Sequence, residues 1–256
     1  IRDIYIDKNA ILWFDTAAGF LYKYHVQKGI LKKYKHNRPS QIHTYLYHSI
    51  YPDSSGKLWI GGRSMPVCYF SPENEEFTYF PIGKAGEKLK EFTDVMSYYE
   101  SLGGEFYVGG VDGLYKLDTI LKSFNRILNY STQDIIQDKN KRTWILNEGT
   151  LKYWGEKDKT IIEIGKEGDR KNGFPSKYPT KLFLDNAGNI WIGTLDGLLK
   201  YAPVKNKVKK VFKIHETTNT LSSNKITAIL ETRSGKILVG SENRGLDVLD
   251  RNFIKT

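Results

Sequence analysis

The chain has 256 residues, of which 39% are hydrophobic and 13% aromatic, and its formal net charge is +10 at pH 7. This apolar content excludes a disordered chain, and the 17 Tyr residues favour strands. No apolar run approaches the roughly 18 residues of a membrane-spanning helix. A basic surface attracts anions, but the Lys residues are scattered along the chain, so we expect no nucleic-acid partner for this segment.

The single cysteine, Cys68, excludes an intrachain disulfide. Its neighbours Val67, Tyr69 and Phe70 indicate a buried strand, where a lone thiol is inert core. The sequence begins at Ile1, inside an expected strand, with neither Met nor a signal peptide. We therefore expect an excised piece of a longer protein.

Six segments share one pattern, which consists of a strand, a tight turn, a second strand with an anchor residue, a second turn, a third strand and a fourth strand. In chain order we expect these segments at residues 1–34, 45–80, 94–127, 134–164, 181–214 and 225–256. The anchor residues are Trp13, Trp59, Tyr107, Trp144, Trp191 and Leu238, and successive anchors are 46, 48, 37, 47 and 47 positions apart.

Glycine marks both inner turns of the pattern. Four of the six residues three positions before the anchor are Gly, as are four of the six residues two positions after it. A short hairpin needs a residue with positive φ, which glycine adopts without a Cβ penalty, so we predict a tight first turn in each segment. Lys141 replaces the first glycine, and Asp15 and Leu146 replace the second, which leaves the turn geometry open there.

Four short strands repeated every forty-odd residues are typical of propeller blades. We therefore predict an all-β fold, a β-propeller with about six four-stranded blades in one segment over residues 1–256, and almost no helix. Stacked blades bury the anchor aromatics, so we interpret the Trp residues as packing residues and not as a sugar platform. The last strand is expected at residues 252–256, and no strand is left over to complete a shared blade. Either six blades close directly or a missing neighbour supplies a seventh.

The repeat resembles the two-component regulator propeller repeat, most clearly in Leu-Asp-Asn-Ala-Gly-Asn-Ile-Trp-Ile-Gly-Thr-Leu-Asp-Gly-Leu at residues 184–198. Leu-Ser-Ser-Asn at residues 221–224 is similar to the inter-blade loop of that family. The resemblance covers nearly the whole chain and is weakest in the first, third and fourth repeats. It implies the periplasmic sensor of a hybrid two-component histidine kinase of the inner membrane, within a larger array of seven-bladed propellers. It also implies pairing as a homodimer, oligosaccharide sensing and control of polysaccharide-utilisation genes.

No pattern of residues indicates catalysis, a metal site or a cofactor. The five His residues lack metal-binding spacing, and neither a nucleophile elbow nor a phosphate-binding loop is present. Asp53, Asp138 and Asp185 precede turns, where a short acid bonds the backbone. We therefore expect that this segment is not an enzyme. Two alternatives stay open: a protein-interaction scaffold, marked by a large apolar patch, and a glycan-cleaving propeller with two acids converging at the axis.

A ligand is expected where the inter-blade connectors and the second turns lie together, since loops on a rigid scaffold carry specificity. Arg binds carboxylate or sulfate bidentately and aromatic rings cover apolar sugar faces, so this edge suits an oligosaccharide that carries acidic groups. Each polar residue taken singly is also explained as an ordinary solvated loop residue. The candidate ligand-binding residues are Arg38, His43, Tyr45, Arg63, Arg170, Lys171, Tyr178, Asn224 and Arg244.

Overall fold

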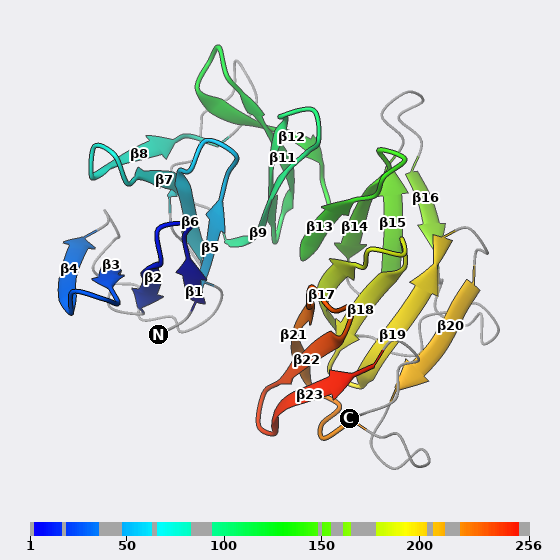
Figure 1. Ribbon diagram of the computed structural model, residues 1–256. Helices are drawn as coiled ribbons and strands as arrows, with labels where there is room; N and C mark the ends of the chain where they lie inside the picture. Colours follow the sequence, from blue (N-terminus) through cyan, green and yellow to red (C-terminus); the bar gives the residue numbers. More distant parts are fainter. Residues whose placement is uncertain are drawn as a thin grey trace. The chain divides into compact units, whose positions relative to one another are not determined.

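The computed structural model describes residues 3–16, 19–35, 48–62, 66–82, 94–147, 150–154, 161–164, 178–203, 207–212 and 221–250. Every named element in these ranges is a β-strand (Figure 1). Consecutive strands pair antiparallel into six sheets, which we call blades 1 to 6 in chain order. The all-β prediction is therefore confirmed. Among the described residues, no helix is long and apolar enough to cross a membrane.

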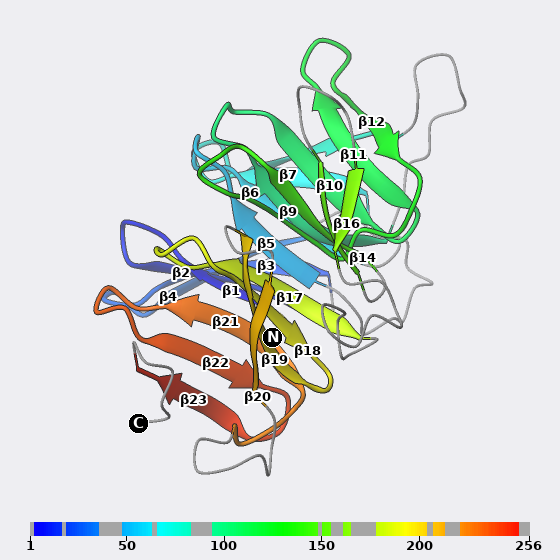
Figure 2. The same ribbon diagram turned by 90° about the vertical axis from the view of Figure 1, so that its right-hand side faces the viewer.

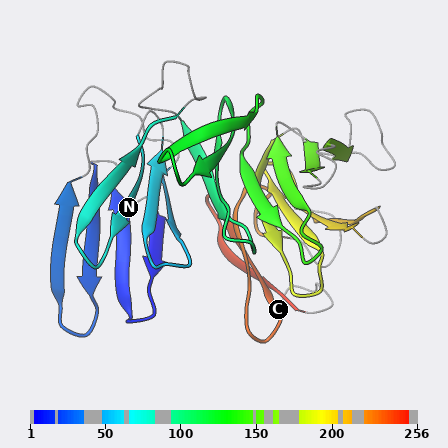
Figure 3. The same ribbon diagram turned by 90° about the horizontal axis from the view of Figure 1, so that it is seen from above.

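The chain forms two compact units, Ile1–Thr132 and Gln133–Thr256. The first unit holds three four-stranded meanders, seen from a second direction in Figure 3. Blade 1 consists of β1 (Asp3–Ile6), β2 (Ile11–Thr16), β3 (Phe20–His25) and β4 (Ile30–Lys35). Blade 2 consists of β5 (His48–Pro52), β6 (Leu58–Gly62), β7 (Val67–Ser71) and β8 (Glu76–Phe80). Blade 3 consists of β9 (Val95–Glu100), β10 (Phe106–Gly110), β11 (Gly113–Asp118) and β12 (Ser123–Leu128).

The second unit holds two four-stranded meanders and one of three described strands. Blade 4 consists of β13 (Asp134–Gln137), β14 (Thr143–Asn147), β15 (Thr150–Trp154) and β16 (Ile161–Ile164). Blade 5 consists of β17 (Pro179–Leu184), β18 (Ile190–Thr194), β19 (Gly197–Ala202) and β20 (Lys207–Phe212). Blade 6 consists of β21 (Ile226–Glu231), β22 (Ile237–Ser241) and β23 (Gly245–Leu249), which lie side by side in Figure 2. The strand expected at residues 252–256 lies outside the described residues.

Each first turn has a left-handed residue three positions before the anchor, as predicted where that residue is glycine. The φ values are 57° at Ala10, 84° at Gly56, 80° at Gly104, 60° at Lys141, 79° at Gly188 and 80° at Gly235. Ala10 and Lys141 keep this geometry without glycine, at a cost of about 1–2 kcal/mol each for the crowded Cβ. The sequence departure at Lys141 therefore leaves the hairpin intact.

The anchor aromatics pack between neighbouring blades. Trp13 lies 5.6 Å from the ring of Phe70 in blade 2, and Trp59 stacks 4.1 Å from Phe106 in blade 3. Trp191 belongs to a buried cluster with residues of blade 6. The interpretation of these Trp residues as packing residues is confirmed. Cys68 is also fully buried, and burial raises the pKa of its thiol.

Glycine after the anchor lets the next blade approach closely. A Cβ added to Gly61 would lie 2.7 Å from the Val95 Cγ1 atom of blade 3. A Cβ added to Gly193 would lie 2.9 Å from the Ile226 Cγ2 atom of blade 6. In both cases a side chain would collide with the first strand of the following blade, which explains this glycine in the repeat.

Polar contacts also join neighbouring blades. The Ile50 backbone N donates to Asp3 Oδ2 at 2.8 Å, and the Leu182 backbone N donates to Asp134 Oδ2 at 2.8 Å. These two acids occupy the same position in blades 1 and 4. In both cases an acid at this position accepts a hydrogen bond from the backbone of the following blade.

In unit 1, Glu75 of blade 2 accepts hydrogen bonds from two residues of β4 in blade 1, Lys32 and the Tyr34 hydroxyl, the latter at 2.6 Å. Lys23 Nζ lies 3.6 Å from the same carboxylate. Hydrogen bonding from Lys32, with that from Tyr34, lowers the pKa of Glu75 to about 2. The edge strand of blade 1 is thereby tied to blade 2 by a charged contact.

Candidate functional site

A buried carboxylate organises the first turn of blade 5. Asp185 is only 5% exposed. Its Oδ1 atom accepts a hydrogen bond from the Asn189 backbone N at 2.7 Å, and its Oδ2 atom accepts from Trp191 Nε1 at 2.9 Å. The Asn189 carboxamide also donates to both oxygens, at 3.1 and 2.8 Å. The carboxylate of Asp185 therefore stabilises the turn and orients the anchor ring through these hydrogen bonds.

The same bond between acid and indole recurs in three other blades. The pairs are Asp7 with Trp13 at 3.0 Å, Asp53 with Trp59 at 2.8 Å and Asp138 with Trp144 at 2.9 Å. The prediction that short acids bond the turn backbone is confirmed for Asp53, Asp138 and Asp185. The structure adds that each acid also fixes the orientation of its anchor.

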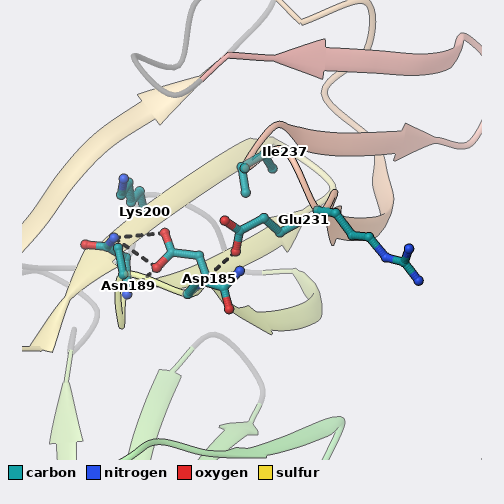
Figure 4. Close-up of a pocket in the computed structure, with 9 residues that line it drawn as sticks. Asp185, Asn189, Lys200, Glu231 and Ile237 are labelled. Atoms are coloured by element: carbon teal, nitrogen blue, oxygen red, sulfur yellow. Dashed lines mark hydrogen bonds between the residues drawn. The ribbon is translucent and has the colours of Figure 1, made fainter.

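A cavity of about 460 Å³ lies between the first turns of blades 5 and 6 (Figure 4). It is lined by Asp185, Asn186, Ala187, Asn189, Lys200, Glu231, Arg233, Gly235 and Ile237. In Figure 4, Asp185 lies between Asn189 and Glu231. The Asn186 backbone N donates to Glu231 Oε2 at 2.7 Å, so the end of β21 is tied to the turn of blade 5.

The lining of this cavity balances two carboxylates against two cations. Lys200 is 4% exposed, and its ammonium lies 4.8 Å from the centre of the Trp191 ring. Desolvated cation–π contacts of this kind fix a lysine in place. Ile237 and Ala187 are the apolar side chains of the lining. Such a lining suits a small polar ligand, and the oxygens of Asp185 already accept four hydrogen bonds from the turn and the anchor ring.

Unit 1 has a cavity in the equivalent place. About 590 Å³ lies between the first turns of blades 1 and 2, with Tyr5, Asp7, Trp13, Asp53 and Glu73 among the lining residues. Burial, with the nearby charge of Asp7, raises the pKa of Tyr5. A cavity recurs where two first turns meet, so it follows from the stacking of blades. The two cavities differ in the residues that line them. Among the described residues, no group of three or more His, Cys, Asp or Glu side chains could hold a metal ion.

Three of the nine predicted ligand-binding residues lie in the described part of the chain. They are Tyr178, Asn224 and Arg244. The other six lie outside the described residues: Arg38, His43, Tyr45, Arg63, Arg170 and Lys171.

Backbone hydrogen bonds bring the three described candidates to one edge of unit 2. Leu195 N donates to the Tyr178 carbonyl at 2.9 Å, and Gly197 N donates to the Asn224 carbonyl at 2.8 Å. Tyr178 and Asn224 therefore flank the turn between β18 and β19. Glu242, in the turn that contains Arg244, donates its backbone N to the Lys225 carbonyl at 3.0 Å. We call this the connector edge; in each meander it lies opposite the first turns and hence opposite the cavity.

Sequence reasoning missed the residues that line the cavity, although one repeat position carries a signal. Glu231 directly precedes the first turn of blade 6, and Glu100 directly precedes that of blade 3. Glu100 accepts hydrogen bonds from the Ser54 backbone N and hydroxyl of blade 2, both at 2.6 Å. An acid at this position therefore reaches back to the preceding turn, and its recurrence was visible in the sequence.

Residues 40–64 and 173–196 match the family model described as two component regulator propeller. These ranges contain the first hairpins of blades 2 and 5. The resemblance noted in the sequence is confirmed in these two repeats. No curated protein matches the chain.

Solved structures of low identity share the fold. The extracellular domain of a hybrid two component system from B. thetaiotaomicron has a TM-score of 0.74 at 18% identity, over 96% of this chain and 32% of that chain. A second such domain from the same organism has a TM-score of 0.60 at 14% identity, over 97% and 39% of the two chains. Virginiamycin B lyase from Staphylococcus aureus has a TM-score of 0.73 at 10% identity, over 99% and 82%. The chain thus spans about a third of the first of these structures. Such likeness establishes the β-propeller fold and nothing about chemistry.

Proposed function

We propose that this chain is a ligand-binding, non-catalytic propeller segment in the extracellular sensor region of a two-component regulator. The observation that carries the proposal is the match of two repeats, at residues 40–64 and 173–196, to the two component regulator propeller family. The fold that the chain shares with extracellular domains of hybrid two component systems supports it. On this proposal the segment is periplasmic and belongs to a homodimeric histidine kinase anchored in the inner membrane.

We place the ligand at the connector edge of unit 2 and propose an oligosaccharide with acidic groups. Tyr178 is 63% exposed and presents an aromatic ring to solvent, and such a ring suits an apolar sugar face. Arg244 is exposed and offers a guanidinium to a carboxylate or sulfate. The backbone bonds around Leu195 and Gly197 hold these loops still, which favours specific recognition. The net charge of +10 adds a general attraction for anions. Binding would shift the packing of paired sensors and so control polysaccharide-utilisation genes.

A glycan array followed by calorimetry on the full chain tests this placement. We expect binding of acidic oligosaccharides that weakens as salt is raised. Tyr178→Ala and Arg244→Ala should each weaken binding roughly tenfold, because each removes one aromatic or charge-assisted contact. Arg233→Ala is the matched control, since it removes an exposed arginine from the first-turn cavity at the other edge.

Each other outcome points elsewhere. Preference for neutral glycans at low salt would refute the acidic ligand. Loss of binding in Arg233→Ala alone would show that the ligand binds in the first-turn cavity instead. Release of shortened sugars during incubation would identify a glycan-cleaving enzyme, and retention of a protein partner without any glycan would identify a scaffold.

A further inference from the structure

In two pairs of neighbouring blades, a glutamate of the second blade bonds the first turn of the first blade. Glu100 of blade 3 accepts hydrogen bonds from the Ser54 backbone N and hydroxyl of blade 2, both at 2.6 Å. Glu231 of blade 6 accepts one from the Asn186 backbone N of blade 5 at 2.7 Å. Both glutamates lie seven positions before their anchor, and both donors lie five positions before theirs. We call this contact the acid clasp.

Blades 1 and 2 have the donor of the acid clasp but lack its acid. Lys8 occupies the position of Ser54 and Asn186, and Pro52 occupies the position of the two glutamates. A proline side chain cannot accept a hydrogen bond. Neither the backbone N nor the ammonium of Lys8 forms a hydrogen bond or ion pair with the residues that the structure describes. The clasp between blades 1 and 2 is therefore incomplete.

The first turn of blade 1 has the same internal hydrogen bonds as that of blade 2. Asp7 Oδ1 accepts from the backbone N atoms of Asn9 and Ile11, at 2.8 and 3.0 Å. Asp53 Oδ1 accepts from the two equivalent N atoms of blade 2, at 2.9 and 3.0 Å. Because turns with the same bonds share one backbone shape, we infer that the Lys8 N–H faces the next blade, as the two clasp donors do.

The cavity of about 590 Å³ in unit 1 lies at this incomplete clasp, and Lys8, Tyr5 and Ser71 are among the residues that line it. Its volume is within the range of about 300–1,000 Å³ that is usual for small-molecule sites. The hydroxyls of Tyr5 and Ser71 form no hydrogen bond with the described residues. Burial, with the charge of Asp7, raises the pKa of Tyr5, so its hydroxyl keeps its proton and can donate. The cavity thus offers several donors to a ligand.

Among the described residues, three acids line the cavity, and two of them are already bonded within their own blades. Asp7 accepts three hydrogen bonds from blade 1, and Asp53 accepts four from blade 2. The third acid, Glu73, is exposed in the turn between β7 and β8. An incoming carboxylate therefore meets the unpaired ammonium of Lys8, and Glu73 is the acid that opposes it.

We propose that the incomplete clasp between blades 1 and 2 binds a small hydroxylated carboxylic acid, whose carboxylate takes the place of the missing glutamate. The carboxylate accepts a hydrogen bond from the Lys8 N–H, as Glu231 does in the complete clasp of unit 2, and pairs with the Lys8 ammonium. The hydroxyls of the ligand bond Tyr5 and Ser71, and its carbon frame lies against the Tyr5 ring. This site belongs to unit 1 alone and is independent of the connector edge of unit 2.

An NMR titration of the isotope-labelled full chain tests this site, with glucuronate as the probe and glucose as its neutral counterpart. We expect glucuronate to move the Lys8 amide proton to lower field, with saturation at millimolar concentration, because a carboxylate then accepts from that N–H. Glucose has the same ring and hydroxyls but no carboxylate, so it should leave the Lys8 amide where it is.

Pro52→Glu supplies the missing acid from the chain itself. The Lys8 amide proton should then lie at low field without any probe, and glucuronate should bind at least about tenfold more weakly. Lys8→Ala should weaken binding about fivefold, because it removes the ammonium. Glu73→Gln should strengthen binding about twofold, because it removes a like charge near the ligand. Arg244→Ala removes an exposed cation from unit 2 and is the matched control, with unchanged glucuronate binding.

Three results would overturn the proposal. Equal movement of the Lys8 amide with glucose and glucuronate would show that the cavity recognises hydroxyls and not a carboxylate. A Lys8 amide that stays in place while the Arg244 amide moves would put the carboxylate at the connector edge. Undiminished glucuronate binding in a folded Pro52→Glu variant would show that the ligand does not occupy the clasp. Should Pro52→Glu fail to fold, Lys8→Ala and Glu73→Gln decide, and wild-type affinity in both overturns the proposal.

Discussion

Replacing Asp185 with Ala should lower the free energy of unfolding of the second unit by about 3 kcal/mol. This value adds the costs of two N–H donors, of Trp191 and Asn189, that would lose their acceptor. Trp191 is fully buried, so its indole N–H, now 2.9 Å from Asp185 Oδ2, would find no water. Leaving such a donor unpaired costs about 1–3 kcal/mol. The Asn189 backbone N–H, 2.7 Å from Oδ1, is only part-buried and adds about 1 kcal/mol.

Urea unfolding followed by circular dichroism measures this change, with the free energy of unfolding extrapolated to water. A double-mutant cycle with Trp191→Phe, which keeps a ring but removes the indole donor, should give a coupling of about 1–2 kcal/mol. Glu242→Gln is the control, because its ion pair with Lys225 is half exposed and is worth under about 1 kcal/mol. A loss below about 0.5 kcal/mol in Asp185→Ala, or a coupling near zero, would refute the role of the acid in fixing the anchor.

Three further predictions rest on single contacts. The pKa of Glu75 is lowered to about 2, so the stability that its ionised carboxylate contributes is complete above about pH 4.5 and is lost as pH falls towards about 2. Glu75→Gln should therefore flatten the plot of unfolding free energy against pH in that window. Parallel plots for the variant and the unchanged protein would contradict this. Gly193→Val should cost about 1–3 kcal/mol in a thermal or urea scan, through its clash with Ile226 of the next blade. Gly240→Val should cost less, because an added Cβ there would lie 3.2 Å from the Ala228 Cβ of its own blade; equal costs would contradict the clash with the next blade as the cause. The Cys68 thiol, buried and with a raised pKa, should resist thiol reagents at pH 8 until urea unfolds the chain; rapid native labelling would disprove its burial.

Much of the fold was predictable because its signals are local. A tight hairpin depends on a left-handed residue a few positions from the anchor, and Gly56, Gly188 and Gly235 adopt it. Sequence reasoning left the turn at Lys141 open because it could not see that the buried bond between Asp138 and Trp144 holds the hairpin without glycine. It also could not explain the glycine after the anchor, because the side chains that leave no room for a Cβ there belong to the next blade.

The candidate site was predictable only in part. Chain order places connectors and second turns at one edge of a meander, so Tyr178 and Asn224 could be grouped from the order of strands and turns alone. The first-turn cavity was missed because its walls come from two repeats. Glu231 and Asn186, which meet at 2.7 Å, are 45 positions apart, and nothing in their local sequence names the partner.

Residues that are close together in the chain specify the repeat: strands, turns and anchors recur because each is set by residues within a few positions of one another. The cavity beside Asp185 became visible only in the folded chain, because residues of two neighbouring blades line it. The physical reason is that contact between blades depends on the distance between sheet faces. Side chains some 46 positions apart set that distance jointly, through shape and burial, and no single repeat contains it.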